Sequence, residues 1–476
     1  MKRMKHQANQ CIALNVASLR RCVSQTERLG AGGIKCRNYR VGPCALGFAG
    51  LLWGLMAQAA APPIYSVTDL GSLGGKASYA NGINNSGQVV GVSLLVDNVT
   101  WHAFLYSGGM MTDLGTLGGT YSSAYDINSN GQVVGASSPA GDTVSHAFLY
   151  SGGVMSDLGT LSGYTTSNAL GINTSGQVVG GPEPTLGGAW HAFLYSGGVM
   201  SDLGTLGGIE SVAWDINDSG QAVGWSTLVG GNAHGFLYSG GVMSDLGSLG
   251  GNSSGAYGIN NSGQVVGFSN LAAGKPTHAF LYSGGMMHDL GSLGGNLSEA
   301  SGINNSGQVV GYSTLADNAT QHAFLYSGGV MSDLNTLLAP NVAGWVLLAA
   351  TAINDAGQIA GYGSINGQTR ALLLTPLPSL TVSNANLTFG TVSSNVGGIS
   401  CGSVCSSSIA SGTAVTLTAI PSSGYQFTGW GGACRGYGNS CTVTVNASQT
   451  VTANFAFFKI HQPVWKRAIN SIIHHQ

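Results

Sequence analysis

Three short motifs recur between residues 69 and 374 at a nearly constant spacing. An Asp-Leu-Gly/Asn motif and a Gly-Gln-x-x-Gly motif each occur seven times, and a His-Ala/Gly-Phe-Leu-Tyr-Ser-Gly-Gly motif occurs six times. Successive Asp-Leu-Gly/Asn motifs are 44, 44, 45, 43, 44 and 44 residues apart. A period of about 40–45 residues is typical of one four-stranded propeller blade. The repeat therefore predicts a chain built from similar supersecondary units.

One repeat contains four short segments with the composition of β-strands. The expected strands are residues 123–128, 132–137, 146–150 and 154–158, and residues 129–131 form the first turn. The Asn-Gly and Gly-Gly pairs between them supply the positive φ angles that tight hairpins need. The segments show no convincing helical period, so we expect an all-β repeat.

The two ends of the repeat region are complementary halves of one unit. Residues 64–69 are expected to form the strand that leads into the first Asp-Leu-Gly motif, but no His-Ala-Phe strand precedes them. Residues 370–374 resemble a His-Ala-Phe strand, but no Gly-Gly-x-Met-x-Asp strand follows them. If the two segments pair, the ring closes and leaves no exposed sheet edge. We therefore predict a seven-bladed β-propeller over residues 60–376. A β-solenoid, which would need terminal caps, is the alternative.

Residues 1–59 have the character of a leader and signal peptide. Residues 45–61 are an uncharged apolar run that follows three basic residues and ends in a small-x-small pattern. This order of segments is typical of a secretory signal peptide. A membrane anchor is the alternative, but the run is shorter than the ~20 residues of a spanning helix. We expect cleavage near Ala59 and a mature chain that is secreted or held at the cell surface, without a transmembrane segment.

Charge and composition exclude several classes of protein. The chain has 16 basic and 18 acidic residues, but nine basic residues and one acidic residue lie in residues 1–59. The remaining chain carries 7 basic and 17 acidic residues, a net charge of 7 − 17 = −10. The absence of a basic excess argues against a nucleic-acid partner. A hydrophobic content of 43% with few charges argues against disorder.

The cysteines fall into two groups of four. One group lies in the leader, and the other lies near the C-terminus, at Cys401, Cys405, Cys434 and Cys441. Four cysteines in an exported chain favour two disulfides. A zinc site is the alternative, which the spacing and the expected oxidising compartment disfavour.

The repeat strings resemble a known bacterial family. His-Ala-Phe-Leu-Tyr-Ser-Gly-Gly, Asp-Leu-Gly-Thr-Leu-Gly-Gly and Ile-Asn-x-Ser-Gly-Gln-Val-Val-Gly are similar to the HAF-type extracellular repeats over residues 65–374. The resemblance implies export from a bacterium and a repeat architecture. It implies no catalytic residues.

The C-terminal region resembles a different bacterial repeat. Residues 380–455 are similar to a repeat domain of the divergent internalin B-repeat type, through strings such as Phe-Thr-Gly-Trp-Gly-Gly-Ala-Cys and Val-Thr-Ala-Asn-Phe. The resemblance implies a small β-domain over residues 377–456, with Cys401–Cys405 and Cys434–Cys441 bridges. Residues 457–476 depart from the pattern and form an unassigned tail.

Six histidines and six aspartates recur as pairs on facing strands of one hairpin. A catalytic site in a ring is normally single, whereas this pairing occurs in nearly every repeat. We therefore expect a structural hydrogen-bond network, because buried polar groups must be paired. The members are His102, Asp113, His146, Asp157, His191, Asp202, His234, Asp245, His278, Asp289, His322 and Asp333.

Positions that differ between otherwise similar repeats are better candidates for ligand recognition. The residue after the alanine of each first strand is Asn81, Tyr125, Leu170, Trp214, Tyr257, Ser301 or Thr351. We expect this strand to lie nearest the propeller axis. The aromatic members, the neighbouring Asp126 and Asp215, and Trp101 and Trp190 before two of the histidines are candidate residues for binding a sugar or a peptide. Packing between blades is the alternative role.

The absence of known catalytic signatures argues against an enzyme. The chain has no sialidase Ser-box, His-Glu-x-x-His or phosphate loop. Asp126 and the Asn128-x-Asn130-Gly131 that follows resemble the start of a calcium loop, but Ser137 stands where its final Glu belongs, so a turn is favoured. We expect no cofactor, no metal and no catalytic residue. A binding or adhesion protein for an extracellular carbohydrate or protein is the first hypothesis. A polysaccharide hydrolase or lyase and a structural surface spacer are the alternatives.

Overall fold

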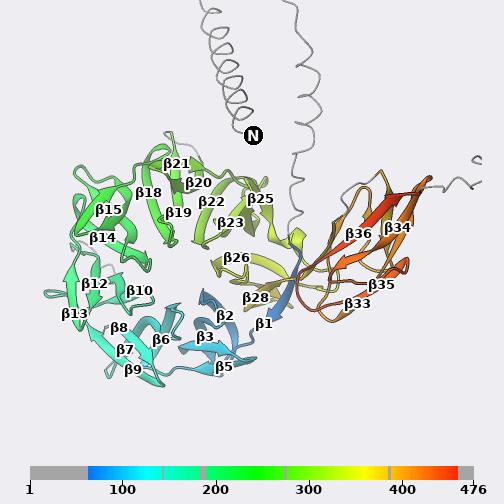
Figure 1. Ribbon diagram of the computed structural model, residues 1–476. Coiled ribbons are helices and arrows are strands. Elements are labelled where there is room, and N and C mark those ends of the chain that lie inside the picture. Colours follow the sequence, from blue (N-terminus) through cyan, green and yellow to red (C-terminus); the bar gives the residue numbers. More distant parts are fainter. Residues whose placement is uncertain (1–62, 142–143, 183–188, 273–275, 384–387, 459–476) are drawn as a thin grey trace, which may run out of the picture. The chain divides into compact units, whose positions relative to one another are not determined.

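A computed structural model describes residues 63–458 except 142–143, 183–188, 273–275 and 384–387 (Figure 1). The leader, the expected cleavage site and most of the C-terminal tail lie outside the described residues. The described part consists of β-strands and one 3-10 helix, η2 (Leu334–Leu337). None of its helices is long and apolar enough to cross a membrane.

Seven blades, each of four antiparallel strands, are arranged around a common centre (Figure 1). The prediction of an all-β, seven-bladed propeller is confirmed. In blades 1 to 3 the strands, from the centre outward, are β2 (Gly74–Ile83), β3 (Val89–Leu95), β4 (Trp101–Ser107) and β5 (Met110–Asp113); β6 (Gly118–Ile127), β7 (Val133–Pro139), β8 (His146–Ser151) and β9 (Val154–Gly159); and β10 (Asn168–Ile172), β11 (Val178–Gly181), β12 (Phe193–Ser196) and β13 (Val199–Asp202).

Blades 4 to 6 repeat this order, and single parallel pairs join β16 to β18 and β20 to β22. Their strands are β14 (Gly207–Ile216), β15 (Ala222–Leu228), β16 (Ala233–Ser239) and β17 (Val242–Asp245); β18 (Gly250–Ile259), β19 (Val265–Leu271), β20 (Thr277–Ser283) and β21 (Met286–Asp289); and β22 (Gly294–Ile303), β23 (Val309–Leu315), β24 (Gln321–Ser327) and β25 (Val330–Asp333).

The seventh blade combines the two ends of the repeat region. It contains β26 (Val346–Ile353), β27 (Ile359–Ile365) and β28 (Gln368–Pro376), with β1 (Tyr65–Asp69) as its outer strand. β1 pairs antiparallel with β28, from Tyr65 opposite Pro376 to Asp69 opposite Leu372. The ring is therefore closed by a strand more than 300 residues away in the sequence.

Two glycines of the Gly-Gln-x-x-Gly motif have separate structural roles. The first, such as Gly220, has φ near +75° in the turn between the first two strands. The second, such as Gly224, lies against a bulge in the inner strand, where an added Cβ would be only 1.8 Å from the carbonyl oxygen of Val212. An alanine there cannot fit, so the motif is a requirement of backbone packing.

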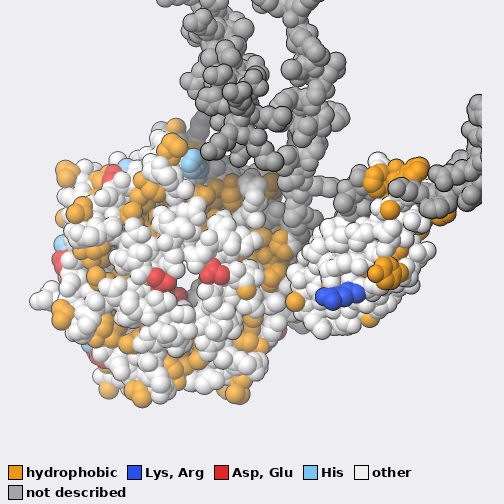
Figure 2. Space-filling view, viewed as in Figure 1, with side chains coloured by type: hydrophobic (Ala, Val, Ile, Leu, Met, Phe, Trp, Pro, Cys, Tyr) orange, Lys and Arg blue, Asp and Glu red, His pale blue; other side chains and the backbone are white. Residues whose placement is uncertain are grey.

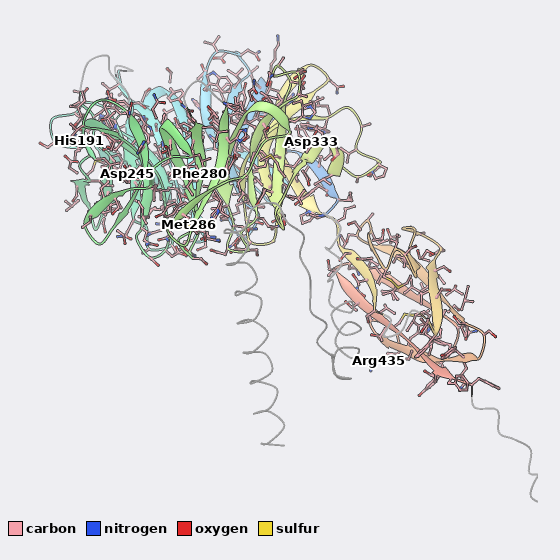
Figure 3. All side chains as sticks on the ribbon, turned by 90° about the horizontal axis from the view of Figure 1, so that it is seen from above. His191, Asp245, Phe280, Met286, Asp333 and Arg435 are labelled. Atoms are coloured by element: carbon pink, nitrogen blue, oxygen red, sulfur yellow. A yellow bond between two sulfur atoms is a disulfide. The ribbon has the colours of Figure 1, made fainter. Side chains whose placement is uncertain are left out.

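The propeller core lies between neighbouring blades. Val90, Ala103 and Leu114 of blade 1 pack with Ile127 and Phe148 of blade 2, and the other blades repeat this cluster. The phenylalanine of each His-Ala/Gly-Phe motif is buried, including Phe280, which is labelled in Figure 3. Each blade therefore completes its apolar core only with its neighbour, as expected for a repeat architecture.

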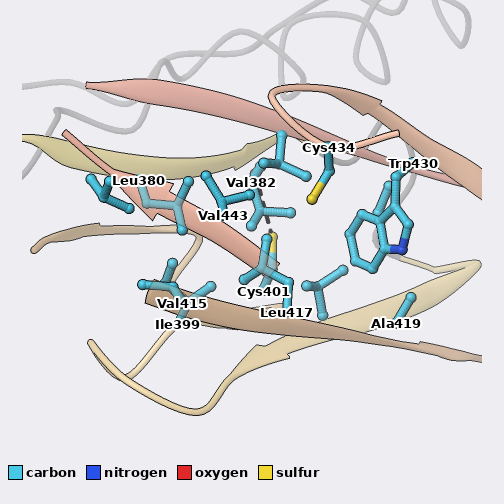
Figure 4. Close-up of a cluster of buried hydrophobic side chains, with 14 of the residues drawn as sticks. Leu380, Val382, Ile399, Cys401, Val415, Leu417, Ala419, Trp430, Cys434 and Val443 are labelled. Carbon is cyan, nitrogen blue, oxygen red and sulfur yellow. Dashed lines mark hydrogen bonds between the residues drawn. The ribbon is translucent and has the colours of Figure 1, made fainter. Parts of the chain in front are cut away.

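The C-terminal domain is a separate sandwich of two four-stranded sheets. One sheet has the order β32-β29-β36-β34 and the other the order β31-β30-β33-β35. Leu380, Val382, Leu417 and Trp430 lie in the core between them (Figure 4). The strands are β29 (Ser379–Ser383), β30 (Gly390–Ser394), β31 (Ser400–Cys401), β32 (Ser406–Ser408), β33 (Thr413–Pro421), β34 (Tyr425–Gly432), β35 (Ser440–Val445) and β36 (Gln449–Phe457).

Both expected disulfides are present in this domain. Cys401 is bonded to Cys405 and Cys434 to Cys441. Disulfides are typical of oxidising compartments and rare in the cytosol. They therefore suggest an extracellular location.

Candidate functional site

The central axis of the propeller contains a cavity lined by the positions that vary between repeats. It measures about 350 Å³. We name it the aromatic cavity. Its lining includes all seven variable residues together with two carboxylates, namely Asn81, Tyr125, Leu170, Trp214, Tyr257, Ser301, Thr351, Asp126 and Asp215. These residues come from the inner strands β2, β6, β10, β14, β18, β22 and β26, so each blade supplies one variable side chain.

The aromatic residues of this cavity form a partly open wall. The Trp214 ring meets the Tyr257 ring edge to face at 5.5 Å between centroids, and Tyr257 also contacts Phe268 at 5.4 Å. Trp214 keeps 36% of its surface exposed in spite of these contacts. Packing therefore orients the indole without covering it, which leaves an aromatic surface available to a ligand.

Asp126 and Asp215 each connect two neighbouring blades. Asp126 Oδ1 accepts a hydrogen bond from the backbone N–H of Ile127 at 2.8 Å, and its Oδ2 accepts one from Ile172 of the next blade at 2.9 Å. Asp215 repeats the arrangement with Ile216 at 2.7 Å and Ile259 at 2.8 Å. Each carboxylate is thereby held in a fixed position at the wall of the aromatic cavity.

The environment of these two aspartates favours their protonated form. Burial raises the pKa of Asp126, and the two backbone N–H donors only partly oppose that effect. Burial also raises the pKa of Asp215, to about 7, and the negative charge of Asp126 adds to the increase. The two carboxylates therefore interact electrostatically within one cavity.

A closed ring of seven asparagines lies where the inner strands end. The Nδ2 of each asparagine donates to the backbone carbonyl of the next one, from Asn84 to Asn128 at 3.1 Å and finally from Asn354 back to Asn84 at 3.0 Å. Each Oδ1 also accepts backbone N–H groups of its own turn. The ring members are Asn84, Asn128, Asn173, Asn217, Asn260, Asn304 and Asn354.

The asparagine ring surrounds a second, smaller cavity of about 180 Å³. Ile83, Ile303 and Ile353 line both cavities, so the two are adjacent along the axis. Asp218 and Asp355 line the smaller cavity. In the space-filling view, acidic side chains gather around the opening at the centre of the ring (Figure 2).

The six His–Asp pairs lie in or next to the two outer strands of their blades, and they line neither cavity. In each pair the histidine Nδ1 is 2.7–2.9 Å from the aspartate carboxylate. The same carboxylate accepts the backbone N–H two residues later, as in Gly115 N–H to Asp113 at 2.8 Å. Each pair thus anchors the turn that leads to the next blade. Figure 3 labels His191, Asp245 and Asp333 of these pairs, together with Met286 near the edge of the ring.

Trp101 and Trp190 lie outside the aromatic cavity. Trp101 begins β4 and packs on Tyr79 at 5.8 Å, and Trp190 packs edge to face on Trp225 at 5.2 Å. Neither tryptophan contributes to the lining. The structure therefore brings five of the seven candidate ligand-binding residues together, namely Tyr125, Asp126, Trp214, Asp215 and Tyr257, and leaves these two elsewhere.

Sequence reasoning missed Glu299 as a neighbour of the site. Its side chain is hydrogen-bonded to Tyr312, and burial raises its pKa. Its charge also contributes to the raised pKa of Tyr257, a residue of the cavity lining. Glu299 differs from its counterparts in other repeats, and that difference is the signal that points to it.

Three of the solved structures that match this chain show a distant likeness. TolB from Acinetobacter baumannii is 11% identical, with 61% of this chain and 64% of that chain covered and a TM-score of 0.37. A gluconolactonase from Xanthomonas campestris is 9% identical, with 67% and 96% covered and a TM-score of 0.32. A Trypanosoma rangeli sialidase is 10% identical, with 63% and 54% covered and a TM-score of 0.32. The fold assignment rests on the seven blades and on the ring that β1 closes.

Sequence comparisons identify a relationship for the C-terminal domain. No curated protein matches the chain. The family model of the divergent InlB B-repeat domain matches residues 387–457. The resemblance expected for this region is therefore supported, and the C-terminal domain is similar to the divergent InlB B-repeat domain.

Proposed function

We propose that this protein is an extracellular binding protein that recognises a carbohydrate or protein ligand at the aromatic cavity. One observation carries the proposal. The residue after the inner-strand alanine varies among the seven repeats, and all seven of these residues line this single cavity. Repeats that served only to build the ring could keep the same residue at this position in every blade. A cavity to which the repeats contribute varied residues is expected where a ligand is recognised.

The chemistry of the cavity supports this role. Ligand sites are typically concave, largely apolar and provided with a few oriented polar groups. The aromatic cavity has that composition, because Tyr125, Trp214 and Tyr257 lie beside Asp126 and Asp215. Its volume of about 350 Å³ suits one sugar residue or one amino-acid side chain.

The repeat strings and the cysteines support an exported protein of the HAF-type repeat family. In this proposal a signal peptide directs export and is cleaved near Ala59, outside the described residues. The two disulfides of the C-terminal domain support passage through an oxidising compartment. Retention at the cell surface would allow the propeller to act as an adhesin.

The test is a binding screen of the mature protein against glycans and extracellular matrix proteins, followed by Trp214→Ala. We expect binding to fall at least tenfold, because Trp214 supplies an exposed ring to the cavity. Trp225→Ala is the matched control, since Trp225 packs on Trp190 and lies outside the cavity lining. Equal binding by both variants would exclude the aromatic cavity as the site.

A polysaccharide hydrolase or lyase is a second candidate, favoured by two carboxylates of raised pKa in one cavity. Glycoside hydrolysis uses such a pair. The oxygens of both carboxylates already accept backbone N–H groups of two blades, which favours the binding role. Turnover of a polysaccharide that Asp126→Asn and Asp215→Asn abolish would support the enzyme instead. A chain with neither ligand nor turnover would be a structural spacer.

A further inference from the structure

The ionisable groups along the axis of the ring are acidic or phenolic. Asp126, Asp215, Tyr125 and Tyr257 are the titratable residues of the aromatic cavity, and Asp218 and Asp355 are those of the asparagine-lined cavity. Among the described residues, no lysine, arginine or histidine lines either cavity. Carboxylates in a concave, low-dielectric site concentrate a negative potential that attracts cations.

Several donors in the aromatic cavity are already used by the protein. The backbone N–H groups of Ile172 and Ile259 donate to Asp126 and Asp215. Asn81 donates its amide to the carbonyl of Ala124 at 2.8 Å, and the Thr351 hydroxyl donates to the carbonyl of Ala80 at 3.0 Å. The carboxylates and Asn81 Oδ1 therefore present acceptor lone pairs to the cavity. A ligand that fits this cavity brings donors rather than acceptors.

The aromatic residues of the cavity also attract cations. Ring faces carry negative electrostatic potential and attract ammonium groups, most strongly when the site is desolvated. Trp214 and Tyr257 meet edge to face, and Tyr125 also contributes to the lining, so rings and carboxylates share one small space. A primary ammonium group offers three N–H donors and a positive charge, and therefore satisfies both kinds of surface.

We infer that the ligand group bound in the aromatic cavity is an alkylammonium, as carried by lysine side chains and by amino sugars. This inference rests on the proposed function, because it names the chemical class of the ligand at the same site. An anionic group would face Asp126 and Asp215 without a compensating cation. A neutral sugar would donate hydrogen bonds to some acceptors but would leave the negative charge of the carboxylates without a cationic partner.

Binding of a cation at this site is coupled to protonation. A positive charge beside Asp215 stabilises its ionised form, whereas the pKa of about 7 means that much of this group is protonated below neutral pH. Burial raises the pKa of Tyr257, so this phenol stays neutral in this range, and Asp126 acts in the same direction as Asp215. Affinity for an ammonium ligand is therefore expected to increase from pH 5 to pH 8.

The experiment is calorimetric titration of the mature protein with four probes. Hexylammonium and 1-hexanol form a charged and neutral pair of similar length. N-acetyl-lysine methylamide and glucosamine represent the two natural sources of the ammonium. We expect hexylammonium to bind at least tenfold more tightly than hexanol at pH 8. The affinity for hexylammonium should be at least threefold lower at pH 5 than at pH 8. The tighter binder of the last two probes identifies the source.

Variants separate a binding effect from a folding effect. Asp215→Asn removes the charge and is expected to weaken hexylammonium binding at least tenfold, with Asp97→Asn in an exposed turn as the control. Trp214→Phe keeps a smaller ring and is expected to retain part of the affinity. Thermal unfolding of each variant shows whether it is folded.

Two results would overturn the inference and leave the proposed function standing. The first is equal affinity for hexylammonium and hexanol in the folded protein. The second is a neutral glycan that binds in a Trp214-dependent manner while the ammonium probes do not bind. By contrast, both proposals would be overturned by a ligand from the screen that binds the Trp214→Ala variant as tightly as the wild type.

Discussion

The carboxylate of Asp126 joins the second blade to the third, because it accepts hydrogen bonds from Ile127 and from Ile172, 46 residues farther along the chain. Asp215 makes the same connection between the fourth and fifth blades. At the equivalent positions of the first and third blades, Gly82 and Gly171 lie close to the backbone of Asp126 and Asp215. Inter-blade contacts at the axis therefore differ from one blade to the next, although the repeats are nearly identical.

The pH dependence of stability is expected to show the protonation of Asp215. Its pKa is about 7 in the folded protein and near 3.8 without perturbation, so the folded state holds a proton that the unfolded chain releases above about pH 4. The contribution of this group to stability is complete below pH 4 and is lost as the pH rises through about 7. We expect the loss to be roughly 1–3 kcal/mol, because the cavity stays open to water.

Chemical unfolding of the wild type and of Asp215→Asn from pH 4 to pH 8 measures this effect. The variant lacks the titrating group, so its curve is expected to fall less steeply with pH than that of the wild type. Parallel curves would show that Asp215 does not titrate with a raised pKa.

Ring closure by β1 is expected to dominate the stability of the propeller. Deleting residues 64–69 removes the outer strand of blade 7 and the fully buried Tyr65, so the melting temperature should fall by more than 10 °C. Removing residues 456–476 is the comparison, because that segment lies beyond the propeller strands. Equal, small losses for both deletions would contradict a closed ring.

Tyr65→Phe is expected to stabilise the protein. The Tyr65 hydroxyl is buried and has no hydrogen-bond partner among the described residues. Removing an unpaired buried hydroxyl while keeping the ring should raise the free energy of unfolding by about 1 kcal/mol. Tyr65→Ala, which also removes the ring, should lower it by roughly 3–5 kcal/mol. A Tyr65→Phe protein less stable than the wild type would reveal a partner for the hydroxyl.

The asparagine ring is expected to be sensitive to single substitutions. Asn217→Ala removes the bond to the Asn260 carbonyl and the bonds to its own turn, at a cost of roughly 2–4 kcal/mol. Asn261→Ser is the control, because Asn261 is exposed and the equivalent residue of blade 2 is Ser129. Its expected cost is below about 1 kcal/mol. Urea unfolding compares the two, and equal losses would argue against a special role for the ring.

The second motif glycine is expected to tolerate no side chain. In Gly224→Ala the new Cβ would meet the Val212 carbonyl oxygen at 1.8 Å, so a loss of more than about 3 kcal/mol or failure to fold is expected. Gly235→Ala provides a matched test in the same blade. The other five copies of its motif have alanine there, and the nearest atom is 3.3 Å away, so we expect a change below about 1 kcal/mol. Similar losses in both variants would contradict the close approach at Gly224.

Much of the architecture could be predicted because its signals are local. The turn between β6 and β7 is visible in the sequence as an Asn-Gly pair, and each hairpin needs only a few neighbouring residues to form. The inner strands proved longer than expected, since β6 begins at Gly118 rather than at residue 123. Its first residues pair irregularly with β7 through a bulge, which weakens the alternation on which a strand prediction depends.

The candidate site could be predicted only in part. The variation among repeats identified Tyr125, Trp214 and Tyr257, because residues at equivalent positions of a closed ring point to a common centre. The same reasoning could not place Trp101 and Trp190, whose positions depend on packing against Tyr79 and Trp225. Those contacts follow from side-chain geometry that the repeat pattern does not contain.

The repeat pattern alone predicts six complete four-stranded units and a seventh divided between the two ends of the repeat region, because hairpin turns and strand alternation are encoded within each repeat. How the units connect at the axis depends instead on contacts between blades that are distant in the sequence. Asn354 donates to Asn84, which is 270 residues away, and Asp126 connects β6 to the neighbouring blade. Such hydrogen bonds exist only after the ring has closed, because closure brings backbone groups of different blades within bonding distance.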